Sequence, residues 1–99
     1  MNEVLIAVFS MKGCPHCTHF KEMLEESNVK YSELDIEEYP DEYEMFVEKT
    51  GGNEFVPAFM VIEIIDNKNK FHYYAPERDY NELEDAIKII KKHRRKINL

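Results

Sequence analysis

The chain has 99 residues, enough for one domain with a single hydrophobic core, and we treat residues 1–99 as that domain. Its apolar fraction of 43% is ordinary for a globular protein, and no apolar run approaches the roughly 20 residues of a membrane-spanning helix. The net charge is −7 and all 20 acidic residues precede residue 91. Because an acidic body repels nucleic acid, we exclude a nucleic-acid binder.

The two ends of the chain suggest its setting. The N-terminus has neither a basic region before the apolar run 4–9 nor a small-residue cleavage site after it, so we expect a cytoplasmic protein without a membrane partner, and a monomer. The segment 91–99 is basic, and we interpret it as a solvated helix end whose cations are favoured by the helix dipole. Its charges are Lys91, Lys92, Arg94, Arg95 and Lys96.

The first half of the chain predicts two strands and two helices. Residues 4–9 are a continuous apolar run rich in β-branched side chains, typical of a strand covered on both faces. A helical pattern follows over 15–27, and alternation at period two predicts a strand over 31–36. A second helix is expected to open at Pro40 and to end at 50–53, where glycine is available for a left-handed cap.

The second half predicts a hairpin and a last helix. Residues 55–65 form a long apolar stretch, 66–69 a turn, and 71–74 the returning strand. Asp79 has the position of an N-cap, with Glu82 three residues later completing a capping box. The order β-α-β-α-β-β-α predicts an α/β fold, with one four-stranded mixed sheet and helices on both faces.

A C-x-x-C motif lies at the junction between the first predicted strand and the first predicted helix. Cys14 and Cys17 are the only cysteines of the chain, too few for a structural disulfide framework, and their spacing points to redox chemistry or metal binding. Cys14 would lie at the helix N-terminus, where the dipole and free N–H groups favour the attacking thiolate. His16 and Lys12 would add positive charge, and Cys17 would resolve the mixed disulfide.

With Cys14-Pro15-His16-Cys17, this element order and Phe55-Val56-Pro57, the chain resembles the glutaredoxin and thioredoxin-like superfamily over nearly its whole length. The resemblance implies a thioredoxin-like fold and a thiol–disulfide oxidoreductase with no tightly bound cofactor. It also implies that Pro57 is cis and faces the cysteine pair, and that the backbone of Val56 pairs with the substrate chain.

Several positions differ from the usual patterns of that superfamily. The loop 75–79, Ala-Pro-Glu-Arg-Asp, stands where glutaredoxins usually have a Gly-Gly and an acidic residue that bind glutathione, and Gly13 stands where thioredoxin has Trp. We therefore predict exchange with protein thiols and disulfides, with a reductase or glutathione for recycling. A glutathione-dependent glutaredoxin and a non-catalytic binding module are the alternatives. The Pro-His centre resembles strongly oxidising thiol oxidases, so we predict a potential above the thioredoxin value of about −270 mV.

Other candidate residues receive simpler interpretations. A zinc site from the C-x-x-C with His16 and His19 is rejected because the helix turns these side chains to different sides, and we predict no metal site. His72 and His93 have no partner set in the sequence and are interpreted as structural or solvated. One of Phe55 and Phe59 could line a substrate groove, but strand alternation also makes them good core candidates, and the sequence does not favour either role.

Overall fold

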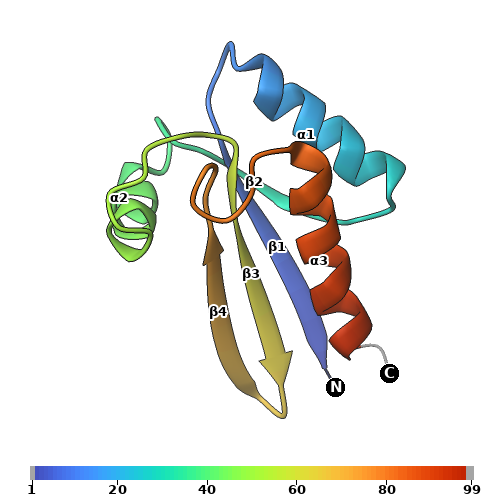
Figure 1. Ribbon diagram of the computed structural model, residues 1–99. Coiled ribbons are helices and arrows are strands. Elements are labelled where there is room, and N and C mark those ends of the chain that lie inside the picture. The colour runs from blue at the N-terminus through green and yellow to red at the C-terminus, as the bar shows by residue number, and fades with distance from the viewer. Residues whose placement is uncertain (1, 98–99) are drawn as a thin grey trace.

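One mixed sheet organises the molecule, with strand order β2-β1-β3-β4. The computed structural model describes residues 2–97 (Figure 1). β1 pairs with β2 in parallel, and β3 is antiparallel to both β1 and β4. The elements are β1 (Glu3–Ser10), α1 (Pro15–Glu26), β2 (Ser32–Asp35), α2 (Pro40–Lys49), β3 (Ala58–Ile65), β4 (Lys68–Tyr74) and α3 (Leu83–Ile97). The predicted fold and element order are confirmed.

The helices cover both faces of the sheet. On one face α1 and α3 lie together (Figure 1), and their apolar side chains pack on alternate residues of β1 and β3, such as Val8 and Val61. On the other face Phe46 of α2 packs against Phe9, with ring centroids 4.8 Å apart. The two central strands, β1 and β3, therefore contribute side chains to a hydrophobic cluster on each face of the sheet. This explains why the run 4–9 is apolar throughout.

The hairpin between β3 and β4 corrects one prediction. Its turn is two residues, Asp66 and Asn67, rather than the four expected, and Lys68 already pairs with Ile65. Both turn residues have positive φ, 51° and 66°. Aspartate and asparagine tolerate this region, and a two-residue turn of this kind matches the twist of the strands it joins.

The start of α3 corrects a second prediction. Asp79 is not its N-cap: the Asp79 carboxylate accepts the Ala75 N–H at 2.8 Å and closes the preceding loop. The helix starts at Leu83, and the first helical N–H groups bond to the carbonyl of Glu82. No described helix has the length and apolar character needed to cross a membrane. The predicted basic end lies on this helix as far as Ile97, and residues 98 and 99 fall outside the described part.

Candidate active site

The two cysteines meet at the first turn of α1. Gly13 has φ +74°, a left-handed conformation that turns the chain after β1 toward the helix. Cys14 is the N-cap and Pro15 occupies the first turn, where its missing N–H costs nothing. Cys14 and Cys17 form a disulfide, their Cα atoms 5.2 Å apart, and the Cys17 N–H donates to Cys14 Sγ at 3.1 Å.

The two sulfurs differ in access. Cys17 is 1% exposed and belongs to the packed side of α1, whereas Cys14 is only partly buried. An incoming thiol or disulfide therefore reaches Cys14 first. A sulfur anion at Cys14 would lie at the positive end of the helix, with a backbone N–H already directed at it. The arrangement favours attack by Cys14 and closure by Cys17.

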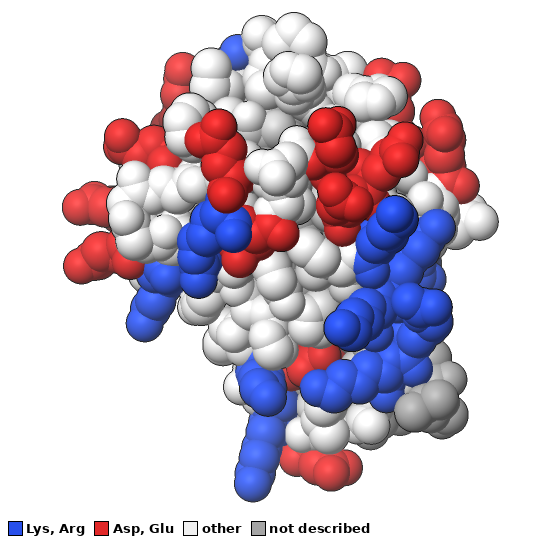
Figure 2. Space-filling model, viewed as in Figure 1, with Lys and Arg blue, Asp and Glu red and all other residues white. Residues whose placement is uncertain are grey.

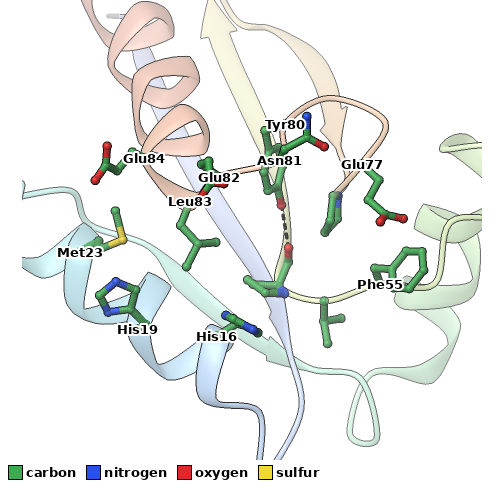
Figure 3. Close-up of a pocket in the computed structure, with 13 residues that line it drawn as sticks. His16, His19, Met23, Phe55, Glu77, Tyr80, Asn81, Glu82, Leu83 and Glu84 are labelled. Atoms are coloured by element: carbon green, nitrogen blue, oxygen red, sulfur yellow. Dashed lines mark hydrogen bonds between the residues drawn. The ribbon is translucent and has the colours of Figure 1, made fainter.

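Pro57 stands at the same edge of the sheet, at the start of β3. The Val56–Pro57 peptide bond is cis, as the resemblance implied. The Tyr80 hydroxyl donates to the buried Pro57 carbonyl at 2.6 Å (Figure 3). Burial, helped by the charge of Asp79, raises the pKa of Tyr80, so the phenol keeps the proton that this bond needs. The loop after β4 is thereby attached to the segment before β3.

A groove of about 580 Å³ opens beside the first turns of α1, where His16 of the C-x-x-C motif lines it but neither cysteine does. Figure 3 shows His16 and His19 on α1 facing Leu83 and Tyr80 across it, with Phe55 at its far end. Its lining comes from α1, the segment before β3 and the loop leading into α3: His16, His19, Met23, Phe55, Val56, Pro57, Pro76, Glu77, Tyr80, Asn81, Glu82, Leu83 and Glu84. The groove thus gathers three of the predicted site residues, His16, Val56 and Pro57.

The lining of this groove combines apolar side chains with three carboxylates. Met23, Phe55 and Leu83 supply apolar surface, and the lining carboxylates are Glu77, Glu82 and Glu84. Figure 2 shows acidic side chains around the upper part of the molecule, with the basic side chains of α3 lower down. Lys12 is exposed in the turn before Gly13 and does not line the groove.

The structure separates the two phenylalanines that the sequence left equivalent. β3 begins at Ala58, so Phe59 points into the core and is 0% exposed. Phe55 precedes the strand, is 58% exposed and lines the groove. Phe71, in the predicted returning strand, is 47% exposed and lies on the edge strand β4.

A second polar cluster was missed by the sequence reasoning. His72 and His93, which we interpreted as having no partners, both contact the buried carboxylate of Glu63. One signal was available in the sequence: residues 59, 61 and 63 alternate along a predicted strand, so Phe59, Val61 and Glu63 share one face of β3, and burial of Glu63 could have been predicted from this. A buried carboxylate requires partners, and the structure identifies them as His72 of β4 and His93 of α3.

The sheet, its helix cover and a disulfide at the start of α1 define a thioredoxin-fold protein with a C-x-x-C centre. A crystal structure of a thioredoxin-like protein mutant superimposes with a TM-score of 0.57 at 20% identity, covering 86% of this chain and 97% of that one. At this identity the likeness concerns the fold alone.

Comparisons of the sequence identify a family within this fold. The glutaredoxin family model matches residues 6–64, more than half of the chain. Glutaredoxin 1 of Rickettsia conorii is 35% identical over 57 residues, 57% of this chain and 56% of the relative. Glutaredoxin 1 of Rickettsia felis is 33% identical over 60 residues, 60% and 59% of the two chains. The matched region thus spans less than two thirds of these relatives. The chain belongs to the glutaredoxin family.

Proposed function

We propose that this protein is a thiol–disulfide oxidoreductase in which Cys14 forms the mixed disulfide with substrate and Cys17 resolves it. The observation that carries the proposal is the position of Cys14, which caps α1, accepts the Cys17 N–H at 3.1 Å and is disulfide-bonded to the buried Cys17. Membership of the glutaredoxin family supports the same chemistry.

The reaction proceeds by two exchanges. The Cys14 thiolate attacks one sulfur of a substrate disulfide, a new Cys14–substrate bond forms, and the second substrate sulfur leaves and takes a proton. The Cys17 thiolate then attacks Cys14 Sγ, which releases the first substrate sulfur and leaves the Cys14–Cys17 disulfide. The substrate is reduced by two electrons and the enzyme is oxidised; an external thiol resets the pair.

The groove supports protein segments as substrates. Its apolar lining residues suit side chains of an extended peptide, and its glutamates favour neutral or basic segments. The backbone of Val56, on the groove wall, would pair with that segment. Glutathione carries two carboxylates, which the same glutamates would repel, so we expect it to be a poorer substrate than a basic peptide; a reductase or glutathione would recycle the pair.

A trapping experiment tests the catalytic assignment. Cys17→Ser should accumulate a covalent adduct with a disulfide-containing peptide, and Cys14→Ser should form none, because Cys17 is 1% exposed. Mass spectrometry of the non-reduced digest locates the bond. Absence of adducts in Cys17→Ser would favour the non-catalytic binding module instead.

Two assays separate the substrate classes. Turnover with a small hydroxyethyl disulfide, coupled to glutathione and its reductase, should be slow compared with exchange on peptides that carry lysine or arginine near the disulfide. The matched comparison is the same peptide with glutamate at those positions. Faster turnover of the small disulfide than of any peptide would favour the glutathione-dependent alternative.

His16 is proposed to raise the reduction potential by stabilising the reduced thiolate. The side chain is exposed and follows Cys14 by two residues. Replacing it by alanine should lower the potential of the pair by about 10–30 mV, equivalent to roughly 0.5–1.4 kcal/mol. His19→Ala is the control, since His19 lines the same groove one turn further along α1. Equal potentials for the two variants would contradict this role.

A further inference from the structure

Glu63, His72 and His93 form a compact cluster toward the end of β3, away from its Pro57 end. The Glu63 side chain is 0% exposed, whereas those of His72 and His93 are 23% and 13% exposed. His72 and His93 lie beyond residues 6–64, the segment that matches the glutaredoxin family model. Two of the three residues of the cluster therefore lie outside the family match, which includes Glu63.

Three elements bring these residues together. Glu63 lies on the face of β3 that is covered by α1 and α3. The strand register pairs His72 of β4 with Val61, which is the neighbouring residue of β3 on that same face. His93 follows Ala86 and Ile90 at helical spacing, on the face of α3 that packs against the sheet. The donor atoms are thus held by two paired strands and a packed helix, which limits how far they can separate.

The distances suit a metal ion. Glu63 Oε1 lies 3.0 Å from His72 Nε2, and Glu63 Oε2 lies 2.8 Å from His93 Nδ1. One donor atom from each of the three residues lies within 4.8 Å of the others. In a tetrahedral site with bonds of about 2.0–2.1 Å, donors are about 3.3–3.4 Å apart. The two contacts, which Glu63 makes with different oxygens, would need to widen by a few tenths of an ångström, and donor atoms as far as 4.8 Å apart would need to close toward the same spacing. Two imidazoles with one carboxylate are a zinc-binding set.

Tyr74 supplies the outer contact that such a site needs. Its hydroxyl lies 2.6 Å from His93 Nε2, the ring nitrogen opposite the one that faces Glu63. Without an ion, the Tyr74 O–H can donate to Nε2 while Nδ1–H donates to Glu63. With Nδ1 bound to an ion, Nε2 carries the proton and donates to the Tyr74 oxygen, which fixes the ring.

An ion would enter from solvent. A groove of about 520 Å³ opens onto both histidines, and its other lining residues are Tyr74, Ile89, Lys92 and Lys96. Lys96 Nζ lies 3.9 Å from Glu63 Oε1, but its side chain is 60% exposed and free to move outward. The groove also leaves room for water as a fourth ligand.

We propose that Glu63, His72 and His93 bind one Zn²⁺, separately from the Cys14–Cys17 pair. The alternative is that the histidines serve only as hydrogen-bond partners of a buried carboxylate. That role explains the two contacts with Glu63 but needs neither the inward groove nor Tyr74 on the second nitrogen of His93. The two roles differ in whether added zinc binds.

The test uses the full chain with its disulfide intact, so that the thiols cannot bind the metal. Zinc titration followed by calorimetry should give one site per chain. In imidazole nitrogen NMR spectra of the unaltered protein, zinc should shift Nε2 of His72 and Nδ1 of His93. Shifts confined to His16 and His19, or no binding, would overturn the proposal, and this measurement needs no variant.

Substitutions sharpen the assignment. His72→Asn should weaken zinc binding at least tenfold, with the exposed His19→Asn as its unchanged control. Tyr74→Phe should weaken binding by about tenfold, while Tyr73→Phe, on the opposite face of β4, should not. Lys96→Ala should tighten binding by removing a nearby like charge. Unaltered affinity in both His72→Asn and Tyr74→Phe would refute the site.

Discussion

The hydrogen bond from Tyr80 to Pro57 offers a direct test of how the groove is held. The change is Tyr80→Phe, which removes the hydroxyl and keeps the ring. The ring packs against Phe59, with centroids 5.6 Å apart, and should keep that contact. The lost bond is 2.6 Å long and buried, and the Pro57 carbonyl would be left without its donor.

The expected magnitude follows from that unpaired acceptor. Leaving a buried polar group without its hydrogen bond costs about 1–3 kcal/mol. For a domain of this size each kcal/mol lowers Tm by about 5 °C, so Tyr80→Phe should melt about 5–15 °C below the unaltered protein. Thermal and denaturant unfolding measure both quantities. Tyr39→Phe is the control, because Tyr39 is 39% exposed and its hydroxyl can turn to water.

Alkaline pH gives the same prediction an independent check. Because burial raises the pKa of Tyr80 in the folded state, its contribution to stability is complete below the unfolded-state pKa of about 10 and declines as the pH rises above it. The stability gap between the unaltered protein and Tyr80→Phe should therefore shrink above about pH 10. A gap equal to that of Tyr39→Phe at neutral pH would refute the reasoning.

Three other substitutions have defined outcomes. Hydrogen bonds from Lys21 and from the buried Ser10 lower the pKa of Glu33. The ionised carboxylate therefore stabilises the fold above its unfolded-state pKa of about 4.3, and this contribution is lost as the pH falls through its folded-state pKa. Since Glu33 is 43% exposed, Glu33→Gln should cost at most about 1 kcal/mol near neutrality. Acid titration of stability should show the two proteins converging as the pH falls through the lowered folded-state pKa of Glu33. Gly52 has φ +91° and open space for a Cβ, so a substitution there is strained only through the backbone. Gly52→Ala should lower the free energy of unfolding, measured with denaturant, by about 1–2 kcal/mol, and Gly52→Asn by less. Equal losses of stability in the two variants would argue against backbone strain. Phe55→Ala should change the unfolding free energy by less than about 0.5 kcal/mol yet slow adduct formation several-fold in the trapping assay, and an unchanged rate would remove this side chain from the substrate surface.

Local patterns in the sequence predicted most of the fold. The apolar run 4–9 and the period-two and helical spacings each depend on neighbours a few residues apart, so they identified every strand and helix. The position of Cys14 is local in the same sense, because strand, glycine turn and Pro15 together place it at a helix N-terminus. These features required no knowledge of the sheet.

The remaining features depend on contacts between distant segments. Asp79 satisfies the local pattern of an N-cap, but the loop fold gives its carboxylate to Ala75 instead. Phe55 and Phe59 became distinguishable only once β3 was seen to begin at Ala58.

The cluster at Glu63 is the clearest case. A buried acid could be predicted from the parity of its strand, but its partners could not. They lie 9 and 30 residues away, and the pairing of β4 and the docking of α3 select them. Residue spacing encodes the faces of single elements, whereas strand register and helix packing decide which faces meet.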